Sequence, residues 1–155
     1  GGPPKKDFFE ITKEEFEQYH RQLLLGFCVL LQKIKINEGG YIFLITTQHI
    51  KQPYAPMTLS FAYRLAFWGI LKSLTKGFAG RQISCINIAP GPIKTKRLNK
   101  LLGKRIKEFE KNLPLKRAGY PDEIGNFVKN IVADDIKYLN GVVINFDGGL
   151  SDAIF

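Results

Sequence analysis

The sequence has few residues of the types that bind metals or form disulfides. Among 155 residues there are two cysteines and two histidines. Cys28 and Cys85 lie in apolar segments (GFCVLL and ISCINI), which predicts reduced thiols in the core of an intracellular protein. His20 and His49 have no cysteine or carboxylate at ligand spacing, so we expect no metal site.

Long apolar runs are also missing. No run approaches the roughly 18 residues that a membrane span needs. No positively charged segment precedes a short apolar run, as it does in a secretory signal. These two absences predict a cytoplasmic protein.

Acidic residues are outnumbered by basic ones. There are 23 Lys and Arg against 14 Asp and Glu, a net charge of +9. This balance favours anionic partners such as a nucleotide, a phosphorylated or acyl-thioester substrate, nucleic acid or a membrane surface. A lysine-rich surface with no specific partner is an equal alternative.

The basic residues are concentrated between Lys94 and Arg117, where ten Lys and Arg face only Glu108 and Glu110. Its charges lack a series of interleaved aromatic residues for base stacking, since Phe109 is its one aromatic residue, and it contains no known recognition motif. We therefore expect neither nucleic acid nor a membrane as partner. A solvated amphipathic helix is the simpler interpretation of the charges.

The spacing of apolar residues predicts alternating helices and strands. Thr12 and Glu15 form a capping box ahead of a helix whose apolar face runs from Phe16 to Ile34. Further helices are expected over about 58–79 and from 121 onward, with an amphipathic basic segment over about 96–112. Short apolar runs typical of strands buried on both faces occur at 41–46, 83–89 and 142–146.

This order predicts one α/β domain over residues 1–155 with parallel strands. The strand at 41–46 would form an exposed apolar edge of such a sheet, and proteins normally protect such edges. Further strands are therefore expected to pair there, from a longer parent chain or from a partner.

Three sequence blocks, in this order, are typical of one enzyme family. They are ISCINIA followed by P-G-P-I-K-T at 90–95, then LPLKRAGYPDEIGNFV, then YLNGVVINFDGG. Together they resemble the second half of the short-chain dehydrogenases/reductases, especially relatives of β-ketoacyl-ACP reductase. The resemblance implies the C-terminal part of a doubly wound Rossmann-type sheet, with strands five to seven of seven.

The family's glycine-rich phosphate loop, T-G-x-x-x-G-x-G, has no counterpart in the sequence. In the family this loop and the helix after it bind the dinucleotide pyrophosphate. The resemblance therefore implies NAD or NADP as cofactor, completed by an N-terminal half of the same fold that is absent from this chain.

The resemblance also implies a catalytic site that is altered here. Family enzymes reduce a carbonyl with a Tyr as proton donor, a Lys four residues later, a Ser and an Asn. Without gaps these positions fall on Ser60, Arg64, Thr47 and Leu23, of which only Thr47 keeps its chemistry. Segment 51–60 resembles that of a divergent branch of the family with S-x-x-x-R in place of Y-x-x-x-K.

The substitutions change what the site can do. Ser60 is a poor acid near neutral pH, whereas Arg64 stays charged and can hold a ribose hydroxyl or an oxyanion. The two keep the i, i+4 spacing that places them on one helix face. Tyr63 and Tyr54 are candidate replacements for the proton donor, although packing explains both residues more simply.

The cofactor contacts implied by the family match better. Pro90, Gly91, Ile93 and Thr95 occupy the element that contacts the nicotinamide, although an ordinary strand-to-loop turn is the alternative. Arg64 is expected at the ribose. The full set of expected cofactor contacts is Gly1, Arg64, Pro90, Gly91, Ile93 and Thr95.

Three functions remain open from the sequence. The first is an NAD(P)-dependent oxidoreductase on a carbonyl or hydroxyl substrate, with an acyl thioester suited to the cationic segment as a lid. The second is a non-catalytic scaffold or pseudoenzyme subunit, and the third, weaker, is a basic binding module. The helices near 16–34 and 59–78 match the two that pair in the family's four-helix bundle, which implies a homo-oligomer, dimer or tetramer.

Overall fold

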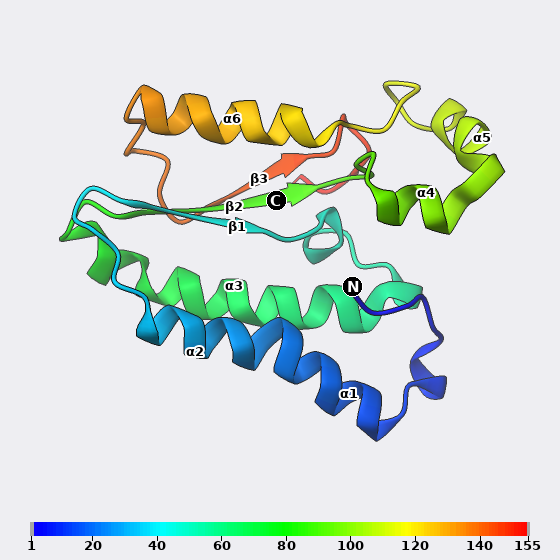
Figure 1. Cartoon of the computed structure of the whole chain (residues 1–155), viewed down its shortest axis with the longest axis horizontal. Coiled ribbons are helices and arrows are strands. Elements are labelled where there is room, and N and C mark those ends of the chain that lie inside the picture. Colours follow the sequence, from blue (N-terminus) through cyan, green and yellow to red (C-terminus); the bar gives the residue numbers. More distant parts are fainter. Residues whose placement is uncertain (1, 155) are drawn as a thin grey trace.

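Three parallel strands form the centre of the structure, a computed structural model that describes residues 2–154 (Figure 1). They are β1 (Tyr41–Ile45), β2 (Ser84–Pro90) and β3 (Val142–Phe146), in the spatial order β1-β2-β3. Both pairings are parallel, with Tyr41 opposite Ser84 and Ile86 opposite Val142. The predicted α/β class and the three predicted strands are confirmed.

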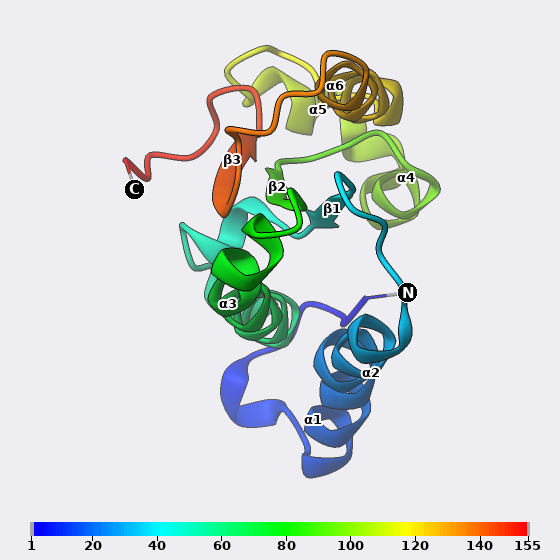
Figure 2. The same ribbon diagram turned by 90° about the vertical axis from the view of Figure 1, so that its left-hand side faces the viewer.

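One face of the sheet is covered by α1 (Lys13–His20), α2 (Gly26–Lys33) and α3 (Thr58–Ala79) (Figures 1 and 2). The predicted capping box is present, because Thr12 Oγ1 accepts from the Glu15 amide and the Glu15 carboxylate accepts from the Thr12 amide. A π-helical turn, Arg21–Leu25, joins α1 to α2. The predicted first helix is therefore continuous but contains one wide turn.

The other face is covered by α6 (Pro121–Ala133), while α4 (Lys96–Leu102) and α5 (Ile106–Lys111) lie beyond the carboxyl ends of the strands (Figure 1). Gly103 separates α4 from α5 with a φ of +51°, a conformation that glycine adopts easily. The basic segment is thus two short helices with a kink between them. Short 3₁₀ turns occur at Phe8–Glu10, Gln48–Ile50, Ala55–Met57 and Gly103–Arg105.

The core lies on both sides of β2. Cys85 faces α3 and packs with Trp68 and Leu71. Ile86 and Ile88 face the opposite way and pack on α6. This alternation follows from the two-residue period of a strand whose faces are both covered by helices.

The outer strands are less buried than the sequence suggested. Side chains of β1 and β3 are half-buried, and Ile45 is 47% exposed. The expectation that both faces of β1 are fully buried was wrong, because β1 has a neighbouring strand on one side only. The expected exposed edge at β1 is confirmed.

The two cysteines also differ. Cys85 is fully buried, and burial raises the pKa of its thiol to about 11. Cys28 lies half-buried on α2, so its expected place in the core was wrong. Among residues 2–154, no helix combines the length and apolar character needed to cross a membrane.

Candidate active site

The principal cavity of the molecule lies where β1 and β2 end. Its volume is about 1190 Å³, and its walls come from the strand ends, the loop after β1 and the helices α4 and α5. In open α/β sheets the carboxyl ends of parallel strands meet at one edge, where ligands bind. This volume is large enough for a small-molecule ligand, whose pockets commonly measure about 300–1,000 Å³.

The floor of the cavity is tied together by polar contacts across strands. Thr46 Oγ1 donates to Asn87 Oδ1 at 2.7 Å, and the Thr46 amide donates to the carbonyl of Ile88. A Cβ on Gly91 would lie 2.9 Å from Asp147 and 3.0 Å from Gln48 Oε1. The turn after β2 therefore packs so closely on its neighbours that only glycine fits there.

The four described residues of the expected nicotinamide element all line this cavity: Pro90, Gly91, Ile93 and Thr95. Thr95 Oγ1 accepts from the Leu98 amide at 3.3 Å and so caps α4, which leaves its hydroxyl proton available to a ligand. Gly1, another expected cofactor contact, lies outside the described residues.

Ser60 and Arg64 meet on α3, as their i, i+4 spacing predicts. Arg64 Nη1 donates to both the carbonyl and the Oγ of Ser60 at 2.6 Å. Ser60 is buried and Arg64 is half-buried. Burial, followed by the nearby charge of Arg97, lowers the pKa of Arg64. The Ser60 oxygen thus serves as an acceptor that holds the guanidinium.

The two candidate phenols have different surroundings. Tyr63 points toward α1, where its hydroxyl donates to the Phe16 carbonyl at 3.1 Å, and burial raises its pKa. Tyr54 lines the principal cavity, with its ring 5.4 Å from the ring of His49 and 5.4 Å from Lys5 Nζ. Tyr54 therefore lines the same cavity as Thr47, whereas Tyr63 points toward α1.

Two cavity residues were missed at the sequence level, Gln48 and His49. The Nδ1 of His49 lies 3.3 Å from the Gln52 carbonyl oxygen, and burial lowers the pKa of His49. Gln48 Oε1 is buried and has no hydrogen-bond donor among the described residues. At the sequence level His49 is interpreted only as a possible metal ligand. The signal that identifies both residues is their position directly after a strand. Residues 2–154 contain no cluster of potential metal ligands.

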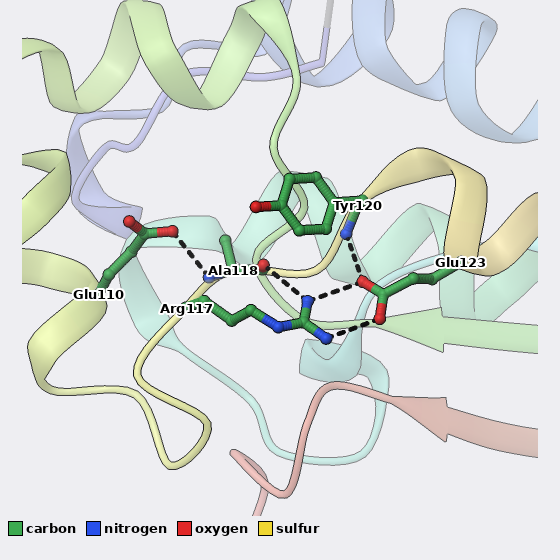
Figure 3. A network of polar contacts seen from close by, with 5 residues as sticks. All are labelled: Glu110, Arg117, Ala118, Tyr120 and Glu123. Carbon is green, nitrogen blue, oxygen red and sulfur yellow. Dashed lines mark hydrogen bonds and ion pairs between the residues drawn. The ribbon is translucent and has the colours of Figure 1, made fainter.

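A polar network fixes the loop between α5 and α6 (Figure 3). Arg117 binds Glu123 through two hydrogen bonds of 2.8 and 2.7 Å, and Glu123 also accepts from the Tyr120 amide at 2.7 Å. Chiefly because of Arg117, the pKa of Glu123 falls to about 2. Glu110 accepts from the Ala118 amide at 2.9 Å.

A smaller cavity of about 290 Å³ adjoins this network, between the turn at Pro92 and the end of β3. Lys94, on the same turn, pairs with Glu110 at 2.9 Å. Within the described residues, Lys94 is thus paired with a carboxylate of the basic segment and Arg117 with Glu123, which follows the segment. Arg97 and Arg105 instead line the principal cavity.

Comparison with known proteins agrees with this geometry. Residues 1–151 match the family model described as enoyl-(acyl carrier protein) reductase. The chain belongs to this family. Over 89 residues it is 35% identical to the 3-oxoacyl-[acyl-carrier-protein] reductase FabG of Buchnera aphidicola, covering 57% of this chain and 36% of that protein. FabG of Thermotoga maritima is 37% identical over 82 residues, 53% of this chain and 33% of the relative.

Solved short-chain dehydrogenases/reductases share the fold. One from Brucella melitensis superposes with a TM-score of 0.88 at 22% identity, over 99% of this chain and 63% of that one. The angucycline C-6 ketoreductase LanV with bound NADP gives 0.85 at 16% identity, over 97% and 60%. This reductase-family chain thus spans about a third of the length of the FabG relatives, and its fold is that of the C-terminal Rossmann portion, as predicted.

Proposed function

We propose that the chain forms the substrate side of an NAD(P)-dependent short-chain reductase that acts on a carbonyl group. One observation carries this proposal: a single cavity at the strand ends joins the Pro90–Thr95 turn to Thr47 and Tyr54. The names of the relatives support it, because those matched are reductases and one fold relative is described with NADP.

The cavity residues fit the nicotinamide end of such a cofactor, which when bound supplies the hydride. A carboxamide presents two donors and one acceptor. Gln48 Oε1 is a buried acceptor in need of a donor, and the Thr95 hydroxyl has a proton to give.

The protein's own groups then position and protonate the substrate. Thr47 Oγ1 accepts from the His49 amide at 3.4 Å, so its proton is free to orient a carbonyl oxygen. Tyr54 is the proton donor, because a phenol (pKa about 10) is a far stronger acid than an alkyl hydroxyl. Ser60 holds Arg64 in place and transfers no proton.

An acyl thioester is the proposed substrate class. Arg97 and Arg105, on the segment that covers the cavity, give its wall a positive potential that favours anionic carriers such as CoA or ACP. We further propose that an N-terminal half of the fold completes the sheet along the free edge of β1. The exposed small residues Ala62, Ala66, Gly69 and Ser73 of α3 support pairing with a second copy.

A non-catalytic relative is the second candidate. It is favoured by the hydrogen bonds between Ser60 and Arg64, which occupy the family's Tyr and Lys positions and engage one another. Such a subunit would keep the fold and bind the nucleotide without turnover.

The Tyr54→Phe variant tests the choice between the two candidates. In the purified protein, completed by the N-terminal half proposed above, NADPH oxidation is followed with an acetoacetyl thioester, and native mass spectrometry records NADPH uptake. We expect Tyr54→Phe to lower kcat by about 10²-fold or more, the usual contribution of a general acid. The matched Tyr63→Phe variant removes a phenol bound to α1 and should keep its kcat within about twofold. Equal rates in wild type and Tyr54→Phe would rule out the phenol, and NADPH uptake without turnover would favour the scaffold.

A further inference from the structure

Two guanidinium groups from distant parts of the chain converge beside Gly2. A Cβ placed on Gly2 would lie 3.1 Å from Arg97 Nη1 and 3.5 Å from Arg64 Nη2. Arg97 extends from α4 and donates to the carbonyls of Gly2 and Pro3, at 3.0 and 2.9 Å. Arg64 reaches the same point from α3, anchored by its hydrogen bonds to Ser60.

Neither guanidinium has a carboxylate within ion-pairing distance among residues 2–154. The ion pairs of this part of the chain involve Arg117 and four lysines, never Arg64 or Arg97. Arg64 Nη2 has no acceptor in the same residues, because both of the side chain's hydrogen bonds come from Nη1. Two like charges, one of them half-buried, therefore lie together without a counterion.

Such an arrangement is costly unless an anion neutralises it. Burying a charge is unfavourable, and a second charge of the same sign adds to the cost. The lowered pKa of Arg64 reports both effects. An arginine fork matches the oxygens of a carboxylate or phosphate better than any other biological anion.

We infer that Arg64 and Arg97 form a binding site for the oxyanion group, carboxylate or phosphate, of a ligand in the principal cavity. Arg97 lines that cavity, so the anion would enter from it. Arg64 Nη2 and the N–H groups of Arg97 that are not bound to the Gly2 and Pro3 carbonyls provide the donors. Gly2 has no side chain, and a Cβ there would lie between the two guanidinium groups. This inference deepens the proposed reductase function, because it adds an anionic group to the ligand.

The test uses inorganic phosphate and acetate as probes and contains no nicotinamide. Isothermal titration calorimetry of the full chain at low salt measures both affinities. In Arg97→Gln we expect the dissociation constant of the preferred anion to rise about tenfold or more, since charge-assisted forked hydrogen bonds are lost. The control Lys104→Gln removes the same charge from the basic segment at an exposed residue outside the cavity lining, and should change the dissociation constant by less than about twofold. Arg97→Lys keeps the charge without the fork and should lie between the two.

Every outcome bears on the inference. Preference for acetate supports a carboxylate on the ligand, and preference for phosphate supports a phosphate. Equal effects of Arg97→Gln and Lys104→Gln, or no saturable binding of either probe, would overturn the site. Arg97 is exposed, so its variant is expected to fold, which thermal unfolding checks. If the anion binds but NADPH is never oxidised, the reductase proposal fails while the anion site stands.

Discussion

Arg117 and Arg64 both lie near the carboxyl ends of the strands. Arg117 has a carboxylate partner, whereas Arg64 has none among the described residues. Arg117 has its own forked carboxylate in Glu123, which raises the pKa of Arg117 (Figure 3). Arg64 contacts only neutral oxygens of Ser60, and its pKa is lowered. This difference distinguishes a structural arginine from an arginine that binds a ligand. The fold gives the first an anionic partner and gives the second none.

Giving Arg64 a carboxylate of its own should remove this difference, with a larger effect than the changes at Arg117 and Glu123 considered below. Ser60→Asp places an acid four residues before Arg64, on the oxygen position that already accepts from its guanidinium. An internal ion pair would compete with external anions, so the affinity for the preferred probe anion should fall about tenfold or more. Titration calorimetry checks this. Ser73→Asp, an exposed site on the same helix, is the control for net charge, and equal losses in both variants would contradict the pairing.

Removing the two arginines in turn should affect stability unequally. Arg117→Ala breaks two charged hydrogen bonds and leaves Glu123 without its partner. Because both side chains are 39% exposed and water screens their attraction, we expect only a small loss in the free energy of unfolding. Arg64→Ala also relieves an uncompensated charge, so its change should be below about 0.5 kcal/mol. Urea unfolding measures both, and a larger loss for Arg64→Ala would reverse the assignment of roles.

The pairing of Arg117 with Glu123 should also contribute to the pH dependence of the folding stability. The pKa of Glu123 is about 2 in the folded protein, below its ordinary value of 4.5. A carboxyl with a lowered pKa stabilises the fold above pH 4.5, and this contribution is lost as pH falls from 4.5 toward 2. Glu123→Gln should therefore show a shallower decline in melting temperature over that window than the wild type. Parallel declines would mean that Glu110 and the other paired carboxylates account for the acid sensitivity.

Local patterns were enough to predict most of the fold. The apolar period and the loop residues around it placed α3 at 58–79 with both ends as observed, and the three strands within one or two residues. Side-chain burial was harder to predict, because a five-residue apolar run has the same pattern in a central strand as in β1. Only the neighbouring strands decide between them, and those are tertiary facts.

The site was predictable where neighbours in sequence are neighbours in space. The i, i+4 spacing of Ser60 and Arg64 predicted their contact. Tyr63 is adjacent to Arg64 in sequence but a helix turns by about 100° per residue, so its hydroxyl meets α1 instead. Arg97 was one cation among ten, and its contact with Gly2 spans 95 residues, a distance that no local pattern reveals.

The wide turn at Arg21–Leu25 determines how α1 is rotated about the helix axis relative to α2. A π turn accommodates one residue more than an α turn, and each residue rotates what precedes it by about 100°. Deleting one residue there would leave α2 packed as before and swing α1 away from α3. The Phe16 carbonyl would then no longer accept the hydrogen bond from the Tyr63 hydroxyl. The segment that carries Gly2 would shift together with α1. Chain length at this turn is therefore under tighter constraint than the identity of its side chains.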